Sequence, residues 1–575
     1  MLLAQPGDLG QIELKVTEKF RAEVGESRKI SQQPNFRDTT TAKLKVNYRI
    51  SSHPIEVKFN PEPISAARIA RVPVEEINQG LVRLGFGLYV TPLAEGYWNS
   101  DRSSQKNFGF WGRHFSTIEG AERIFSNNAL SETELGAYYN RFFRKFSWSS
   151  KVSASWDKYS YYGIDEFPVG LNLPQEVQTF MDDPEKPLTN RFSRFEAESG
   201  ITTRQPMNLM PREARIKFYH FNDSYQARES RFQVFTDWEL PTGEQPLNVE
   251  LNMSGLGINF DSAALGDESA YLNGLFDSIY PTDQAHLTFQ LRPSIDLVLN
   301  KLFFRFGFNL YANDYESDLS VGEFNLFFFP ELQVYFPFVE DVLSIYGGVN
   351  GQIRHNSFRN LTDDNPYITP AFVSRPTRTT DVFAGFEGLL GPTTSFNLRG
   401  GLLIQKDLGL YYRDPNYRSA YFTDSLRSFP SLDLLYDNGE VFYARGEISV
   451  NIDNNLQAGV YGELRSYDLN NQEAAWHLPN FLAGLNFTYT YREKLKLGTD
   501  WNYVGRRTAF VQEDMPSIEA KLSGYLDVGL NFEYLYNSRL SGFVRVSNLL
   551  NQQYDLYLGY KAQRINFLMG FAYKF

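Results

Sequence analysis

The chain ends in the stretch Ile565-Asn566-Phe567-Leu568-Met569-Gly570-Phe571-Ala572-Tyr573-Lys574-Phe575, and this stretch decides the fold class. Large apolar side chains occupy every second position up to the final residue, whereas the intervening positions carry Asn, Gly, Ala and Lys. Only Leu568 breaks the alternation. A period of two over this length predicts a β-strand with one apolar and one polar face.

The same period recurs at 481–492 and 526–534, where apolar residues alternate with Gly, Asn, Asp, Glu and Thr. A soluble β-sandwich also alternates, with its apolar faces turned inward. Here aromatic residues gather near the strand ends, and the apolar face runs the whole length of each segment. These two features favour a membrane barrel, in which the apolar face meets lipid.

Composition points to the same class. The 575 residues include 48 Phe, 35 Tyr, 7 Trp and 42 Gly but no Cys, and the mean hydropathy is −0.39. No uninterrupted apolar run is long enough for a helical membrane span, and the lack of Cys excludes disulfides, Cys-ligated zinc and thiol catalysis. The net charge of −12 argues against nucleic acid as a partner. In an outer-membrane barrel only alternate residues meet lipid, so the average stays polar.

The spacing of turns predicts the number of strands. Short turns alternate with longer connections back from the C-terminus, which requires one strand inside 165–210, and 190–201 supplies it. Continuing to residue 80 predicts an all-β, transmembrane, antiparallel up-and-down barrel of about 22 strands, within a range of about 18–22, over 80–575. The expected short turns lie near 536–538, 493–495, 452–454, 391–394, 337–341, 299–301 and 242–245.

The hairpin around 452–454 tests the register. Pairing Asn451 with Asn455 keeps apolar residues on the outer face of both strands, with Arg445 facing the lumen and Glu463 diagonal to it. The polar lumen residues predicted here are Arg445, Glu447, Glu463 and Arg465. These residues either orient a polar solute or belong to the barrel wall, where they form hydrogen bonds and ion pairs with neighbouring side chains and with water.

The N-terminal part differs from the barrel. Residues 1–4 resemble the tail of a secretory signal peptide, with a small residue at Ala4. Residues 5–79 alternate charged and apolar groups and then become rich in proline, which predicts a partly extended periplasmic arm. The expected location is the bacterial outer membrane, with its lipid as the surrounding medium.

Two C-terminal motifs resemble the end of TonB-dependent receptors. They are Val546-Ser547-Asn548-Leu549-Leu550-Asn551-Gln552-Gln553-Tyr554 and the final strand that finishes in Tyr573-Lys574-Phe575. The segment 84–92 resembles the first barrel strand of a TonB-receptor-like group with a short N-terminal arm. The resemblance implies a Gram-negative transport barrel, and Tyr573 and Phe575 resemble the signal that the barrel-assembly machinery reads during insertion.

The arm departs from the family pattern. TonB-dependent transporters carry a globular plug before the barrel, and 79 residues are too few for one. The segment Ile12-Glu13-Leu14-Lys15-Val16 resembles a TonB box, which pairs with a partner by β-augmentation, although any exposed alternating strand fits as well. Such docking predicts a periplasmic or outer-membrane protein partner.

No enzyme motif is found in the sequence. The six histidines are scattered without metal-ligand spacing, and neither a nucleophile elbow nor a phosphate-binding loop occurs. We therefore expect no catalytic residue, no metal site and no cofactor. The acidic runs at 182–185 and 362–365 carry oxygen ligands suited to Ca²⁺ but lack EF-hand spacing, which favours solvated loop acids.

Two functions remain open at this point. The first is a TonB-receptor-like barrel without a plug that binds or passes a polar solute, its lumen occluded by the arm or by loops. The alternative is a non-transporting barrel that acts as a subunit or scaffold of an outer-membrane secretion, assembly or surface-protein complex.

Overall fold

The computed structural model describes residues 78–118, 128–163, 189–204, 210–243, 245–260, 283–314, 324–369, 372–413, 431–452, 455–511 and 518–575. The predicted signal remnant at 1–4, the arm up to residue 77 and the acidic run at 182–185 lie outside these ranges. No helix among the described residues is long and apolar enough to cross a membrane.

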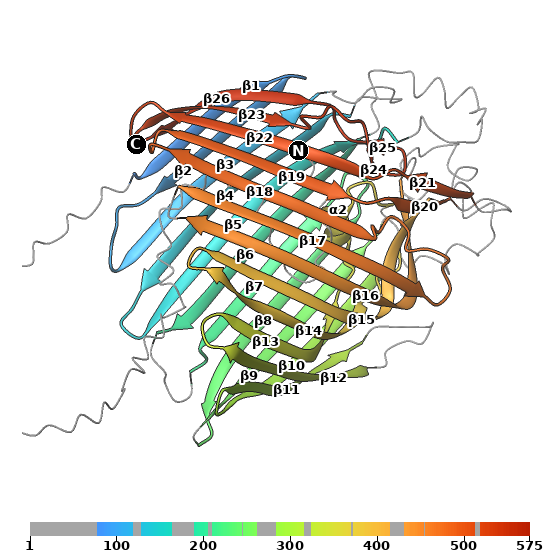
Figure 1. The fold of residues 1–575 in the computed structure, drawn as a ribbon. Helices are drawn as coiled ribbons and strands as arrows, with labels where there is room; N and C mark the ends of the chain where they lie inside the picture. Colours follow the sequence, from blue (N-terminus) through green and yellow to red (C-terminus); the bar gives the residue numbers. More distant parts are fainter. Residues whose placement is uncertain are drawn as a thin grey trace, which may run out of the picture.

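Twenty-two strands form one closed antiparallel sheet, as the turn spacing predicts (Figure 1). These strands are β1 (Gly80–Gly87), β2 (Thr91–Asn99), β3 (Lys106–Thr117), β4 (Leu130–Phe142), β5 (Phe146–Ser160), β6 (Thr189–Thr203), β7 (Glu213–Asn222), β8 (Arg228–Pro241), β9 (Pro246–Asn259), β10 (Asp283–Leu299), β11 (Leu302–Asn313), β12 (Asn325–Val339), β13 (Leu343–Arg354), β14 (Thr377–Gly391), β15 (Thr394–Tyr412), β16 (Asp433–Ile452), β17 (Leu456–Leu469), β18 (Phe481–Tyr491), β19 (Leu495–Val504), β22 (Tyr525–Leu535), β23 (Leu540–Ser547) and β26 (Asn566–Lys574). Strand β6 is the strand expected inside 165–210.

The barrel closes where its first and last strands meet. Strand β1 pairs with β2 on one side and with β26 on the other, and Leu81 lies opposite Lys574. Every other neighbour in the sheet is also antiparallel, so no strand edge stays open. Short turns join the strands at one end, called here the turn rim, and longer connections join them at the other, called the loop rim.

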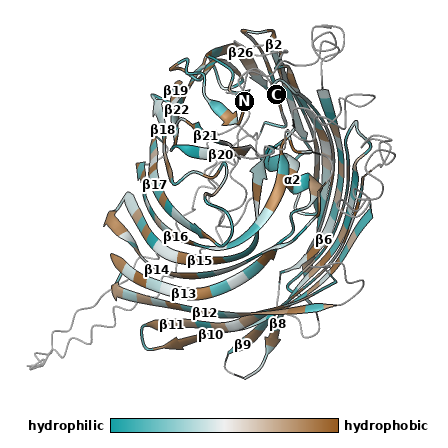
Figure 2. Cartoon of the chain, turned by 90° about the vertical axis from the view of Figure 1, so that its right-hand side faces the viewer, coloured by the Kyte–Doolittle hydropathy of each residue, from teal (hydrophilic) through white to brown (hydrophobic). Residues whose placement is uncertain are grey.

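Among the described residues, four short strands and one helix belong to the connections of the loop rim. Strands β20 (Arg507–Val511) and β21 (Ile518–Leu522) form a hairpin between β19 and β22, and β24 (Asp555–Tyr557) and β25 (Tyr560–Lys561) lie between β23 and β26. Helix α2 (Phe358–Asp364) lies between β13 and β14. Figure 2 shows α2 and the β20–β21 hairpin inside the ring of barrel strands.

The outer face of the barrel is apolar, as the alternation predicts. On β12, Leu326 and Phe328 are 70% and 62% exposed, and on β26 Met569 and Phe571 are 54% and 50% exposed. Apolar side chains exposed at alternate strand positions fit a surface that lies in lipid rather than in water. The chain is therefore a transmembrane barrel.

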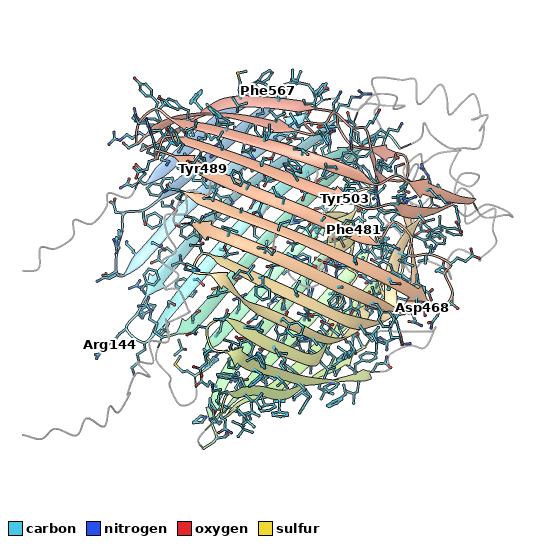
Figure 3. The ribbon with its side chains drawn as sticks, in the orientation of Figure 1. Arg144, Asp468, Phe481, Tyr489, Tyr503 and Phe567 are labelled. Carbon is cyan, nitrogen blue, oxygen red and sulfur yellow. The ribbon has the colours of Figure 1, made fainter. Side chains whose placement is uncertain are left out.

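Aromatic side chains form bands toward both ends of the strands. Phe481 and Tyr503 contact each other at a ring distance of 5.7 Å near the loop rim, and Tyr489 lies toward the turn rim (Figure 3). Arg144 and Asp468 mark the two opposite ends of the barrel in the same view. Such aromatic girdles occupy the two interfaces of outer-membrane barrels.

Leu568 breaks the C-terminal alternation because it faces inward. Its side chain is 5% exposed and packs with Leu93 and Phe543 in a small cluster on the inner wall. The exception in the sequence thus marks a local apolar contact inside the lumen, beside the seam where β26 meets β1.

The predicted register of the β16–β17 hairpin is wrong by two residues. Asn451 pairs with Gln457, not with Asn455, so Glu463 lies directly opposite Arg445 rather than on its diagonal. A shift of two residues keeps every side chain on its predicted face, so the apolar pattern does not distinguish the two registers. The observed register brings opposite charges together across the strand pair.

Candidate functional site

The predicted polar residues on β16 and β17 meet in one ion-pair network on the lumen wall. Glu463 accepts a hydrogen bond of 2.9 Å from Nη1 of Arg445 and also bonds to Arg465. Glu447 lies 3.3 Å from the Arg445 guanidinium. Glu463 is buried, whereas the Glu447 side chain is 43% exposed. The network therefore has one buried carboxylate between two guanidiniums.

Similar networks occur elsewhere on the inner wall, where sequence reasoning did not single them out. Glu95 on β2 binds Arg83 at 3.1 Å and Arg113 at 3.4 Å. On the far side, Arg292 bonds to Glu331 at 2.7 Å. The inner wall is thus both charged and largely self-paired, in keeping with the polar interior of outer-membrane barrels.

Helix α2 places an apolar surface inside this polar lumen. Ser357 caps the helix, and its hydroxyl accepts a hydrogen bond of 3.3 Å from the backbone N–H of Asn360. Phe358 and Leu361, three residues apart, lie on one face of the helix and are both buried. They pack against inward-facing side chains of β6, β7, β9 and β16, which are Phe192, Tyr219, Phe221, Leu256, Ile258 and Leu434.

Charged side chains hold the same helix to the wall. The Arg359 guanidinium lies 2.8 Å from Glu196 of β6 and stacks over the Tyr219 ring at 4.4 Å. Arg354 bonds to Asp364 at 2.6 Å, and Arg194 bonds to Asp363. The acidic run at 362–365 is expected to be solvated, and the Asp363 side chain is indeed 46% exposed, although both aspartates of the run also pair with arginines.

A cluster of tyrosines extends the contact across the lumen. Tyr367 follows α2 and stacks on Tyr560 from the β23–β26 connection, with ring centroids 3.6 Å apart. Tyr162, which follows β5, contacts both rings and donates a hydrogen bond of 2.9 Å to the carbonyl oxygen of Lys561. Burial raises the pKa of Tyr162 to about 12, so this phenol stays neutral. Connections from three parts of the barrel thus meet at one point.

His477 ties two further connections together. Its Nδ1 lies 3.0 Å from the carbonyl oxygen of Tyr411, and its Nε2 lies 3.3 Å from the backbone N–H of Leu558. A neutral imidazole with the proton on Nδ1 satisfies both contacts. Burial lowers the pKa of His477 to about 3, so this form persists at physiological pH.

A cavity of about 440 Å³ lies beneath these connections. Strands β2–β7 line one part of its wall and β22, β23 and β26 line another, while parts of the connections, mainly residues 362–367 and 554–564, also contribute. The volume falls within the range of small-ligand sites, about 300–1,000 Å³. Its charged lining residues are Arg113, Glu132, Asp157, Arg194, Asp363, Asp364, Asp527, Arg545 and Arg564.

None of the predicted site residues lines this cavity. Arg445, Glu447, Glu463 and Arg465 lie on β16 and β17, away from its lining, and the TonB-box-like residues Ile12, Glu13, Leu14, Lys15 and Val16 lie outside the described residues. Tyr573 and Phe575 lie on and just beyond β26 at the turn rim. The closely spaced tyrosines at 159–162 are the one feature of the sequence that points to the tyrosine cluster above the cavity. Within the described part of the chain, no group of three or more His, Asp or Glu side chains could hold a metal ion.

Searches by sequence give no relative. No protein-family model matches the chain, and no curated protein matches it. Solved structures do match. The siderophore receptor PirA from Acinetobacter baumannii has a TM-score of 0.62 at 9% identity, covering 86% of this chain and 80% of PirA. The F5-1 variant of the FrpB iron transporter from Neisseria meningitidis has a TM-score of 0.64 at 13% identity, covering 87% and 82%.

A third match is a mutant (R480A_Q482A) of the ferric enterobactin receptor PfeA from Pseudomonas aeruginosa. Its TM-score is 0.60 at 11% identity, and the alignment covers 86% of this chain and 80% of the receptor. At these identities the similarity concerns the fold. The chain thus has the fold of the TonB-dependent receptor barrels of the bacterial outer membrane.

Proposed function

We propose that the protein binds and passes a polar solute across the outer membrane, and that its own connections close the lumen. One observation carries the proposal: residues 355–369, which follow β13, reach across the lumen to β6, β7 and the β23–β26 connection. A barrel of 22 strands is too wide for its wall side chains to fill. The segment that contains α2 packs through a buried apolar core inside the barrel, and in this proposal it closes the lumen.

The structural neighbours support a solute receptor rather than an enzyme. They are a siderophore receptor, an iron transporter and a ferric enterobactin receptor. The cavity beneath the inserted segment gives such a solute a place to bind. In this proposal the loop rim faces the outside, because outer-membrane barrels carry long extracellular loops and short periplasmic turns. The function needs neither a cofactor nor a catalytic residue.

The remaining parts of the chain fit this orientation. Residues 1–4 are the remnant of a signal peptide, and residues 5–79 form a periplasmic arm that docks a protein partner through 12–16. Residues 80–575 form the barrel. The barrel-assembly machinery recognises the C-terminal strand through Tyr573 and Phe575, and lipid surrounds the inserted barrel.

The test replaces the inserted segment with a tight turn. Arg354 pairs with Thr377 across β13 and β14, so Asn-Gly in place of residues 357–374 joins two strands that are already neighbours. In planar bilayers the wild-type protein should show no stable conductance steps, whereas the replaced variant should show large ones. Heat-modifiable mobility on gels confirms that each variant is folded.

A second variant that lacks residues 5–75 separates the two candidate occluding elements. If only this deletion opens the channel, the arm closes the lumen and the role proposed for the inserted segment is wrong. If both folded variants stay closed, the lumen does not conduct. The alternative function, a non-transporting scaffold, then becomes the better description, because a scaffold does not have to let a solute through its lumen.

A further inference from the structure

Cationic side chains gather on one part of the turn rim, over strands β3 to β6. The connections after β2, β4 and β6 contribute them, together with the ends of β3 and β4. They form one basic patch, which consists of Arg102, Lys106, Arg141, Arg144, Lys145 and Arg204. All six are exposed, and none makes an ion pair with a described residue. Figure 3 shows Arg144 at this end of the barrel.

Backbone pairing holds the members of the basic patch side by side. Lys106 and Arg141 lie directly opposite each other on β3 and β4. The N–H of Arg204 donates to the carbonyl oxygen of Lys145 at 2.8 Å, which joins the connection after β6 to the turn after β4. Neighbouring strands lie about 4.8 Å apart. The cations of β3 to β6 therefore form one continuous surface.

The basic patch contains little compensating negative charge. Asp101 is the only acidic residue in the three connections, and its carboxylate accepts a hydrogen bond from Gln79. Another cation of the turn rim, Lys301, instead pairs with Glu340 at 2.7 Å. A local excess of positive charge in a chain whose net charge is −12 favours an anionic partner.

Aromatic side chains place the basic patch at the level of lipid headgroups. On β3 and β4, the outward-facing pair next to Lys106 and Arg141 is Phe108 opposite Tyr139. Tyr139 contacts Trp148 of β5 at a ring distance of 5.6 Å. Aromatic bands of this kind lie at the membrane interface. The next outward position along a strand lies about 7 Å farther from the apolar core, where the phosphate groups of lipids are found.

A lipid phosphate fits this part of the wall better than a free anion or an acidic protein. Like charges directly opposite each other destabilise a strand pair, and a phosphate between Lys106 and Arg141 would remove that cost. The Arg141 guanidinium lies over the ring of Phe143 at 5.2 Å. The apolar face of the same strands continues with Phe110 and Leu135, which are exposed. Acyl chains below the phosphate would cover this face, which a free anion cannot do.

We propose that the basic patch binds the phosphate groups of anionic phospholipids in the leaflet around the turn rim. Lys106 and Arg141 hold the headgroup against the wall, and the other four cations add attraction to the anionic lipid surface. Each cation near such a surface strengthens binding about fivefold. This binding takes place on the outside of the barrel, so it goes beyond the proposed function and does not depend on solute passage through the lumen.

Native mass spectrometry of the purified full-length barrel in a non-ionic detergent tests the proposal. The probes are dioleoyl phosphatidylglycerol and dioleoyl phosphatidylcholine, which differ only in their headgroups. The wild-type protein should bind the anionic lipid at least about tenfold more tightly. Raising the ionic strength from about 0.1 M to about 1 M should reduce this preference, because the Debye length falls from about 10 Å to about 3 Å. Equal affinities for the two lipids would overturn the proposal and favour an acidic protein as the partner.

Glutamine variants with matched charge locate the site. The first variant neutralises four cations of the basic patch: Lys106→Gln/Arg141→Gln/Arg144→Gln/Lys145→Gln. The control neutralises two lysines and two arginines in other turns of the same rim: Lys301→Gln/Arg492→Gln/Lys494→Gln/Arg539→Gln. The patch variant should lose the preference for the anionic lipid, and the control should keep it. Equal losses, or a preference that survives in the patch variant, would contradict the assignment.

A smaller variant and a competitor complete the test. Arg144→Gln/Lys145→Gln changes only the turn between β4 and β5 and should lose part of the preference, even if the fourfold variant fails to fold. Heat-modifiable mobility shows which variants are folded. Inorganic phosphate in excess, at constant ionic strength, should not displace the anionic lipid. Displacement would show that the basic patch is a site for free phosphate, and an unchanged preference in the double variant would place the lipid site elsewhere.

Discussion

The backbones of Gly80 and Phe575 bind each other in both directions. The N–H of Gly80 donates to the carbonyl oxygen of Phe575 at 2.9 Å, and the N–H of Phe575 donates to the carbonyl oxygen of Gly80 at 3.0 Å. The Phe575 ring covers Gly80 where a β-carbon would clash with it. The last residue of the chain thus closes the barrel against the first residue of β1.

Removing Phe575, or replacing it with Asp, should lower the amount of folded barrel in the outer membrane. Deletion removes both closing hydrogen bonds, and Asp places a charge where an aromatic ring covers the seam. Heat-modifiable mobility of membrane fractions measures the folded amount. Tyr536→Asp is the control, because this turn-rim aromatic is 68% exposed and lies away from the seam. Equal losses in the two substitutions would show that the seam has no special role.

Leu485→Arg should destabilise the barrel far more than Asn486→Arg. Leu485 is exposed on the outer face of β18, whereas the next residue faces the lumen. A lipid-facing Arg near the bilayer midplane costs about 2–4 kcal/mol, while the lumen accepts a charge. Guanidinium unfolding in liposomes measures the difference in the free energy of unfolding. A difference near zero would mean that the face assignment of β18 is wrong.

Glu463→Ala should lower the free energy of unfolding by about 3–5 kcal/mol, because it leaves two guanidiniums facing each other without their buried carboxylate. Glu447→Ala removes a half-exposed partner of the same Arg445 and should change it by less than about 1 kcal/mol. The same unfolding measurement compares the two variants. Similar losses would show that the β16–β17 network is open to solvent.

Acid should loosen the connections that His477 joins. Its pKa is about 3 in the folded protein and about 6.5 when exposed, so between these values the unfolded form binds the extra proton. The contribution to stability is therefore complete above pH 6.5 and falls as the pH drops toward 3. The protection of residues 470–480 and 555–561 against hydrogen exchange, after correction for the intrinsic pH dependence of amide exchange, should decrease over this interval.

His477→Asn should reduce that dependence on pH. Asn does not titrate, tolerates the positive φ of 60° at this position and can still donate to the carbonyl oxygen of Tyr411. An unchanged pH profile in the variant would assign the acid sensitivity to another group.

The barrel could be predicted from the sequence because alternation and turn spacing act locally. Strand β6, the seven short turns between 242 and 538 and the outward face of β26 all follow from a period of two. The register of β16 and β17 did not follow, because a shift of two residues preserves that period. The packing of Phe358 and Tyr367 depends on partners that are distant in the sequence, such as Phe192 and Tyr162, and nothing in the local pattern indicates that residues 355–369 turn inward.

The segment that contains α2 also has a mechanical consequence. It begins between β13 and β14, and its tyrosine reaches the ends of β5 and the connection before β26, so it forms a chord across the ring. A wide ring of strands flattens easily into an ellipse, and a chord with a packed core resists that flattening. The cross-section of a barrel without this segment should therefore fluctuate more than that of the braced barrel, and the roundness of the barrel becomes a property of one connection of the loop rim.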